Sequence, residues 1–237
     1  MLSKLKVNGR LVGSSLLVFF LFGTLFLTSC LNTDDPEPLE IANVSIYHGS
    51  PDAGGLDIIV GSNQINNNSF EFEDYSYYID FFPGDRQLKF TEHDNLSNVL
   101  IDTTFTFEID KIYSVYIADS LSSIEAVLLN DEFPEAETGK AMVRFVHLSP
   151  DVQEINVSID EENLFNEQTF KDGTDFVGIN AGTTTLGVVT ANELNEVLLN
   201  VPDVKFEEGN YYTIILNGFR TPPDGNTNEL SADIIEL

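Results

Sequence analysis

Histidine, serine and aspartate, the residue types of a nucleophilic catalytic triad, occur close together at two places in the chain. The first group is His48, Ser50, Pro51 and Asp52, and the second is His147, Ser149, Pro150 and Asp151. In a triad the imidazole bridges a serine and a carboxylate that converge from separate elements. Here the three residue types lie within five consecutive residues that a proline interrupts. We therefore expect no catalytic residue in either group.

A turn accounts better for the same residues. Proline at the second position of a turn fixes φ, and an aspartate in a turn accepts backbone N–H bonds. A histidine on the inner face of a strand end can donate to that aspartate or to a carbonyl. We interpret the repeated His-x-Ser-Pro-Asp motif as structural, with ligand binding and catalysis as the alternatives.

Patterns that could hold a metal are weak. Cys30 is the single cysteine, so neither an internal disulfide nor a cysteine-based zinc site can form. Residues 224–229 (DGNTNE) offer oxygen ligands like the start of a calcium loop, but Glu229 stands at the sixth position, where an EF-hand requires glycine. His93 lies in a polar stretch that is typical of a loop tip. We expect no dedicated metal site and no cofactor.

The motif belongs to a longer internal repeat with an offset of 99 residues. Two blocks align at this offset: residues 42–60 with 141–159, and residues 107–117 with 206–216. Between them, Pro83-Gly84 and Ala181-Gly182 correspond at an offset of 98. A repeat of this length has the size of a small domain and is too long for a solenoid unit.

Within each copy, apolar and polar residues alternate with the period of two that is typical of strands. The alternating or β-branched runs of the first copy are 43–48, 56–60, 75–82, 86–91, 100–107, 112–119 and 124–129; those of the second are 143–147, 155–159, 175–181, 183–189, 197–206, 211–218 and 229–237. About seven short strands per copy, separated by proline and glycine turns, predict an immunoglobulin-like antiparallel β-sandwich. The fold class is therefore all-β, with tandem sandwiches at 41–130 and 140–237 and an acidic linker at 131–139.

The N-terminus is typical of an export signal. Residues 1–10 are polar and basic, and residues 11–27 form an apolar run. The sequence Leu-Thr-Ser-Cys at 27–30 resembles the lipobox of bacterial lipoproteins, which implies that residues 1–29 are removed and that Cys30 receives a lipid anchor. An ordinary secretory signal or a single transmembrane helix is the alternative.

Residues 30–40 follow as the lipidated cysteine and a short acidic, proline-containing tether. An acidic cluster at this position resembles the surface-export signal of some Gram-negative lipoproteins. We expect the protein in the cell envelope, lipid-anchored to the outer membrane and exposed at the cell surface.

The charge of the chain excludes nucleic acid as a partner. The chain has 11 Lys+Arg and 39 Asp+Glu, a formal net charge of −28, and residues 1–30 hold three of the basic and none of the acidic residues. The remainder therefore carries 8 − 39 = −31. Such a charge repels phosphates and anionic headgroups. It favours diffuse binding of divalent cations, which needs no dedicated site. Apolar residues make up 42% of the chain, enough for a packed interior.

The repeated His-x-Ser-Pro-Asp blocks, each between two alternating strands, resemble the opening motif of the DUF4397 family of secreted and surface-anchored bacterial β-domains. The turns at Pro83-Gly84 and Ala181-Gly182 and the strands that contain Tyr113 and Tyr212 agree with the same family. The first copy departs from it at Asp110-Lys111, where the family usually has Gly-Lys. Two tandem copies would cover residues 42–237. The resemblance implies a β-domain fold and a secreted or surface-anchored location, but it implies no catalytic mechanism.

These observations predict a non-enzymatic surface lipoprotein that acts as an interaction, adhesion or structural module of the envelope. The expected partners are the membrane, through Cys30, and an extracellular glycan or protein. A glycan- or peptide-capturing protein that uses the loops at one end of a sandwich is the alternative. A hydrolase built across the cleft between the two domains is the third interpretation.

Overall fold

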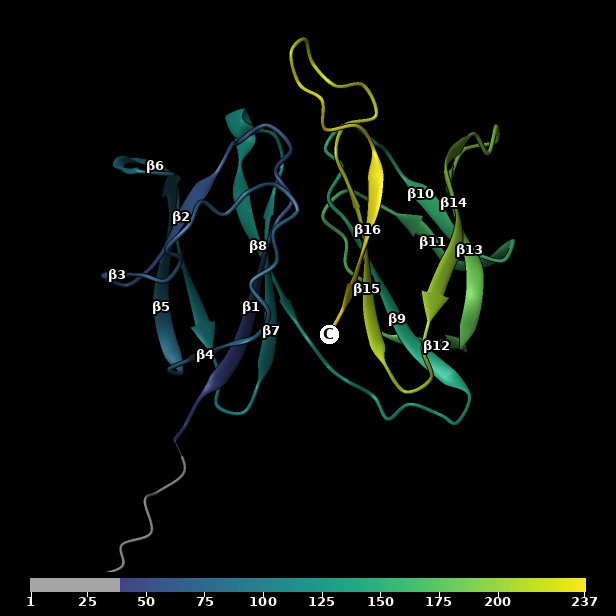
Figure 1. The fold of residues 1–237 in the computed structure, drawn as a ribbon, viewed down its shortest axis with the longest axis horizontal. Coiled ribbons are helices and arrows are strands. Elements are labelled where there is room, and N and C mark those ends of the chain that lie inside the picture. The colour runs from purple at the N-terminus through teal and green to yellow at the C-terminus, as the bar shows by residue number, and fades with distance from the viewer. Residues whose placement is uncertain (1–38) are drawn as a thin grey trace, which may run out of the picture. The chain divides into compact units, whose positions relative to one another are not determined.

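The computed structural model describes residues 39–237, and all but one of their regular elements are strands (Figure 1). The predicted signal peptide and Cys30 lie outside the described residues. In the first copy, one sheet has the order β4-β1-β7-β8 and consists of β1 (Ala42–His48), β4 (Ile79–Phe81), β7 (Ile112–Ala118) and β8 (Glu125–Asn130). The other has the order β3-β2-β5-β6 and consists of β2 (Leu56–Val60), β3 (Asn63–Gln64), β5 (Gly84–Glu92) and β6 (Asn95–Phe107). The 3-10 turn η1 (Leu121–Ser123) follows β7.

The second copy repeats this arrangement. One sheet has the order β12-β9-β15-β16 and consists of β9 (Lys140–His147), β12 (Val177–Asn180), β15 (Tyr211–Asn217) and β16 (Ser231–Glu236). The other has the order β11-β10-β13-β14 and consists of β10 (Ile155–Ile159), β11 (Glu162–Gln168), β13 (Gly182–Thr190) and β14 (Val197–Phe206). The prediction of an all-β chain with two sandwiches is confirmed.

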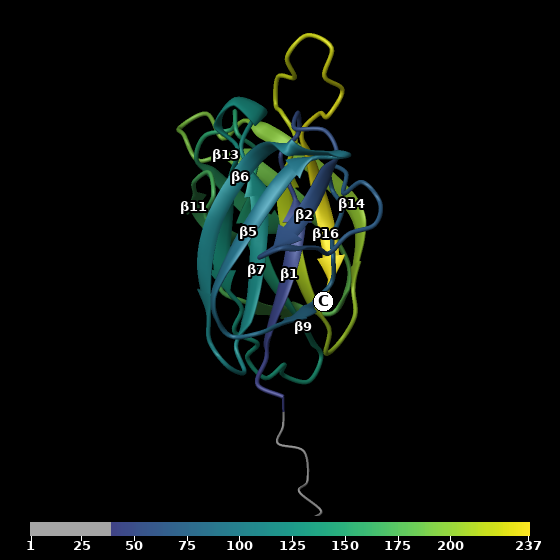
Figure 2. The ribbon, with the colours of Figure 1, turned by 90° about the vertical axis from the view of Figure 1, so that its left-hand side faces the viewer.

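Each sandwich encloses its own apolar core. In the first copy, Val44 of β1 and Val115 of β7 pack in the same cluster as Leu88 and Phe90 of β5, so both sheets contribute to one core. Figure 2 shows β5 and β6 in front of β1 and β7. The second copy builds its core in the same way from the sheets of β9 and β13. Alternation along each strand supplies the inward-facing residues.

One strand pair in each copy is parallel. β1 runs parallel to β7, and β9 runs parallel to β15, whereas the other pairs between named strands are antiparallel. The four strands of these two pairs are almost entirely buried. A strand that is covered on both faces has no need for a polar face, which explains the nearly continuous apolar runs in β7 and β15.

The second buried face belongs to an interface between the copies. We call β4-β1-β7-β8 and β12-β9-β15-β16 the inner sheets. In each of them, the face that points away from the core of its own sandwich contributes to a third apolar cluster, which both copies share. That cluster contains Tyr47, Tyr116, Ala118, Val146, Leu148 and Ile215. Each inner sheet thus has one face in its own core and one face against the other inner sheet. The two sandwiches are therefore in direct contact.

The contacts across this interface are reciprocal. Gly49 and Leu148 occupy equivalent positions of the repeat, and a Cβ added to Gly49 would lie 2.5 Å from Leu148 Cδ1. Glu73 accepts a hydrogen bond from Ser231 of β16, at 3.2 Å. Its counterpart Lys171 forms an ion pair with Glu125 of β8, the strand equivalent to β16. An interface in which equivalent positions exchange contacts is the pattern of a two-fold homodimer, here built within one chain.

A polar network lies next to the apolar cluster of the interface. The side chains of Arg144 and Asp131 are 3% and 0% exposed and form an ion pair. Arg144 also donates to Thr213 Oγ1 at 2.9 Å and to Ser114 Oγ at 3.0 Å. Tyr78 donates to Asp131 Oδ2 at 2.7 Å. Burial acts to lower the pKa of the Arg144 guanidinium, but the nearby Tyr116 and Asp131 raise this pKa above its ordinary value.

The segment predicted as a linker takes part in this packing. The ring of Phe133 lies 5.2 Å from that of Phe176 and 5.1 Å from that of Tyr211, both in the second copy. It also contacts Tyr78 of the first copy, with a centroid distance of 6.3 Å. Asp131 joins the buried network described above. The acidic composition of 131–139 gave no indication that these two side chains connect the copies.

We expect that Asp131→Ala will lower the free energy of unfolding by about 3–5 kcal/mol, because it leaves the Arg144 guanidinium buried and unpaired. The double variant Arg144→Met/Asp131→Leu should recover most of this loss, since it removes both charges. Urea unfolding measures each change. Glu196→Ala is the control: it breaks the exposed Arg220–Glu196 pair, with side chains 41% and 53% exposed, and should cost less than about 1 kcal/mol. A loss in Asp131→Ala no larger than in this control would contradict the prediction.

Candidate functional site

The first His-x-Ser-Pro-Asp motif forms a closed turn at the end of β1. His48 is fully buried, and its Nε2 lies 2.8 Å from the carbonyl oxygen of Gly54. A carbonyl can only accept, so Nε2 carries the proton. Nδ1 then accepts from the backbone N–H of Ser50, at 3.3 Å. The ring therefore spans the turn between two backbone groups and bonds a carbonyl, not the aspartate of the motif.

The second motif, at the end of β9, shares the bond of the histidine Nε2 to a carbonyl. His147 Nε2 lies 3.3 Å from the carbonyl oxygen of Gln153, again six residues further along. Its buried Nδ1 has no hydrogen-bond partner among the described residues. Burial lowers the pKa of both His48 and His147. Both imidazoles are consequently neutral near pH 7.

The aspartates of the motifs tie these turns to a neighbouring loop. Asp52 Oδ1 accepts from the N–H of Leu121, in the loop after β7, at 2.7 Å. Asp151 accepts from Arg220 N at 2.7 Å and from Thr221 N at 2.8 Å, in the loop after β15. Leu121 and Arg220 are equivalent at the offset of 99. In each copy, the carboxylate thus links the turn after one strand, β1 or β9, to the loop after its parallel neighbour, β7 or β15.

The serines of the motifs are buried. Ser149 Oγ donates to the carbonyl oxygen of Gly218 at 2.6 Å. Ser50 Oγ is buried without a hydrogen-bond partner among residues 39–237. The bonds that the structure gives to the histidine, serine and aspartate therefore hold the turn together and do not form the relay of a triad.

A further loop connects the two motif ends. Asn226 and Asn228, in the stretch with the calcium-like pattern, donate to the carbonyl oxygen of Pro51 at 2.9 and 2.6 Å. Their side-chain amides therefore contact the first motif. Among residues 39–237, no group of three or more His, Cys, Asp or Glu side chains is placed to hold a metal ion.

The loops at this end of the fold form what we call the distal end. They are residues 49–55, 119–124, 148–154 and 218–230, which follow strands of the inner sheets, and residues 191–196, which connect β13 to β14. A polar hollow of about 380 Å³ lies there beside the second motif. Asp151, Gln153, Glu154, Asn192 and Arg220 contribute to its lining. Carboxylate, amide and guanidinium groups of this kind can hydrogen-bond a polar ligand.

The interface between the copies, by contrast, is closely packed around Arg144. Its cavity measures about 10 Å³ and is bordered by Tyr75, Tyr116 and Arg144, among others. This is about the room that one water needs. The hydroxyl of Tyr75 is buried there without a partner among the described residues, and burial raises the pKa of Tyr75 to about 12. This cavity has no room for a substrate larger than water.

One pair of chemically active residues was not predicted. Asp57 is 2% exposed, and its Oδ1 lies 2.8 Å from Nδ1 of His93. This hydrogen bond is the largest of the effects that raise the pKa of His93. The positions equivalent to Asp57 and His93 in the second copy hold Asn156 and Ala191. This difference between the copies is the signal that could have identified the pair.

Among protein families, the model described as a domain of unknown function, DUF4397, matches residues 42–158 and 141–230. The two matches overlap at 141–158, which includes the second motif, and together extend from β1 to the loop before β16. Among curated proteins, none matches the chain. The described residues contain no helix that is both long and apolar enough to cross a membrane.

The buried histidines predict a loss of stability in acid. An unfolded chain takes up protons on His48 and His147 as the pH falls through about 6.5, whereas the folded chain, in which both pKa values are lowered, does not. The unfolded state then binds more protons, so the free energy of unfolding decreases below pH 6.5. Urea unfolding between pH 8 and pH 5 should show this decrease, and it should be smaller for His147→Gln.

His93 supplies a control of opposite sign. Its raised pKa contributes stability that is present below about pH 6.5 and is lost as the pH rises through the folded-state pKa. His93→Gln should therefore make the loss on acidification steeper than in the parent chain. Equal slopes for the parent and both variants would contradict the assignment.

Proposed function

Because the chain belongs to the DUF4397 family and carries two copies of its domain, we propose that it is a lipid-anchored envelope protein with a non-catalytic role. In this proposal Cys30 holds the protein on the outer membrane. The double sandwich then presents the distal end at the cell surface, as an interaction, adhesion or structural module.

The direction of β1 carries the proposal. The tether joins the fold where β1 begins, at Ala42, and the first motif starts where β1 ends, at His48. Seven strand residues at about 3.3 Å each place the motif about 20 Å from the point of attachment. Leu148, in the second motif, contacts the first at Gly49, so both motif turns lie at the same end. A lipid at one end and loops at the other suit a protein that projects binding loops from a membrane.

The use of the motif residues supports a non-catalytic role. His48 and His147 are buried and neutral, and their Nε2 protons are directed to carbonyls. Asp52 and Asp151 are occupied by backbone N–H groups. Groups that are committed to turn geometry are not free to attack a substrate or to shuttle its protons.

Acylation tests the anchor. Labelled palmitate should be incorporated into the full chain and not into Cys30→Ala, and the variant should leave the membrane fraction, because several acyl chains bind a bilayer far more firmly than none. Antibody against the distal end on intact cells should then detect the parent protein. Unlabelled parent protein would overturn the anchor, and labelled protein hidden from antibody would place it on the inner side of the membrane.

Capture of a glycan or peptide is the second candidate function, and the polar hollow beside Asp151 favours it. Residues 40–237 form one compact unit and can be applied to glycan and peptide arrays. Any ligand found should bind Asn192→Ala more weakly than the parent, because the Asn192 side chain lines the hollow. Thr185→Ala, on β13 but outside the lining of the hollow, should bind like the parent. An array without a ligand would count against capture.

A further inference from the structure

Two turns of the first copy lie at the end of the fold where β1 begins. Residues 82–83 connect β4 to β5, and residues 108–111 connect β6 to β7. Strand register brings them to the same end, since Phe81 pairs with Ala42 and Gly84 pairs with Phe107. The N–H of Asn43 donates to the carbonyl of Lys111 at 3.0 Å, which joins the second turn to the start of β1. We call residues 82–83 and 108–111 the basal tip.

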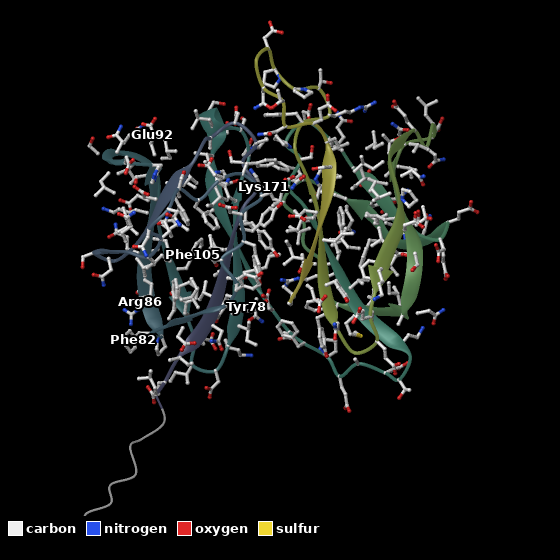
Figure 3. The ribbon with its side chains drawn as sticks, viewed as in Figure 1. Tyr78, Phe82, Arg86, Glu92, Phe105 and Lys171 are labelled. Carbon is white, nitrogen blue, oxygen red and sulfur yellow. The ribbon has the colours of Figure 1, made fainter. Side chains whose placement is uncertain are left out.

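The basal tip exposes large apolar side chains. Phe82 is 63% exposed and Ile109 is 45% exposed. Figure 3 shows Phe82 next to Arg86 at the end of the first sandwich where β1 begins. Neither side chain belongs to the core cluster of the copy. Single exposed apolar residues are common, so exposure alone does not distinguish this surface.

Comparison with the second copy distinguishes the basal tip from an ordinary exposed surface. Phe82 corresponds to Asn180 at the offset of 98 that aligns the adjoining turn, and Ile109 corresponds to Glu208 at the offset of 99. The same two turns on the same fold are therefore polar in the second copy. The apolar pair is confined to the copy that directly follows the tether.

Arg86 forms hydrogen bonds with backbone carbonyl groups in and beside the turn of residues 82–83. Its guanidinium and Nε donate to the carbonyl oxygens of Phe82 at 2.9 Å, Pro83 at 2.6 Å and Asp85 at 3.1 Å. Carbonyls that are already bonded cost less to remove from water. The residue equivalent to Arg86 in the second copy is Thr184. The first copy thus differs from the second in both the exposed side chains and the group that holds their turn.

We propose that the basal tip is a membrane-contact surface, in which Phe82 and Ile109 enter the boundary between headgroups and acyl chains of the bilayer that holds the lipid on Cys30. This inference rests on the proposed function for its anchor. Residues 31–41 can span at most about 40 Å when extended, so the tether keeps the tip within reach of the bilayer at high effective concentration.

The charges at the tip select the kind of bilayer. Glu108, Asp110 and Lys111 are exposed, so acidic residues outnumber basic ones at the tip, and the chain after Ser29 is strongly acidic. Anionic headgroups would repel such a surface. The tip therefore fits a zwitterionic membrane, where burial of apolar side chains supplies the attraction.

The chain has no tryptophan, so Phe82→Trp provides a single fluorescent probe in the full lipidated protein. In phosphatidylcholine vesicles with brominated acyl chains, the indole emission of this variant should shift to shorter wavelength and lose intensity by quenching. Leu194→Trp is the matched control, because Leu194 is 82% exposed at the distal end; its emission should stay unquenched. Adding Ile109→Glu, which introduces the residue type of the second copy, should reduce the quenching in Phe82→Trp.

Mass spectrometry of Cys30 and sedimentation with the vesicles, on the same samples, separate the possible failures. Protein that is not acylated and does not sediment would refute the anchor of the proposed function. Phe82→Trp protein that is acylated and sediments, but whose indole is unquenched, would overturn the basal tip alone. Equal quenching at positions 82 and 194 would also overturn it. A blue shift that grows with protein concentration in the absence of vesicles would indicate contact with a second copy of the chain, contrary to the inference.

Discussion

Burial of both faces of the inner sheets is the constraint on which the rest of the structure depends. Each sandwich buries one face of its inner sheet in its own core, and the opposite face is covered only because the other copy packs against it. Within that interface, the guanidinium of Arg144 and the carboxylate of Asp131 lie almost without exposure to water. An ion pair of this kind gains little over a well-packed apolar contact, but it strongly disfavours any arrangement that separates its partners. Thr213, Ser114, Tyr116 and Tyr78 form further hydrogen bonds with the pair.

Docking of the copies gives the chain two ends with different properties. The parallel pairs of β1 with β7 and of β9 with β15 bring both motifs and the loops that follow the paired strands to the distal end. There Asp52 and Asp151 bind the backbone of those loops, and Asn226 connects the loop of the second copy to Pro51 of the first. The hydrogen bonds of Asp52 and Asp151 occur at equivalent positions of the two copies, and they hold the motif turns and the neighbouring loops together at the distal end.

Comparison of the copies separates the residues that both share from those that only one copy has. The duplicated residues, such as the buried histidines, maintain the fold in both copies. The residues that differ have other tasks: Arg144, where the first copy has Ser45, builds the interface. Asp57 and His93 form a pair that the second copy lacks. Within one chain, the second copy thus serves as an internal reference that separates what the fold requires from what has been added to it.

The sequence by itself determined the architecture of each copy and the existence of two copies. Period-two alternation located the central strands, and the motif with its offset identified the family, because both signals are local and are repeated. The sequence did not reveal β3, which is short, or β11, which lacks alternation. It also predicted a strand at 75–82, where the structure has a strand only at Ile79–Phe81. The carbonyl partners of His48 and His147 were among the predicted possibilities. The Asp57–His93 pair was not, since its residues are 36 positions apart and lie on different strands or turns.

Only the tertiary structure decided what the outer faces of β1, β7, β9 and β15 do. Alternation shows that a strand has two faces, but it cannot show whether the second face meets water or another sheet. Tyr47, Val146 and Ile215 are compatible with either setting in a local pattern. Their burial depends on residues of the other copy, far away along the chain, and so does the pairing of Phe133 in the linker with both copies. Contacts of that range depend on how complete sheets fit together, a property that no local stretch of sequence contains.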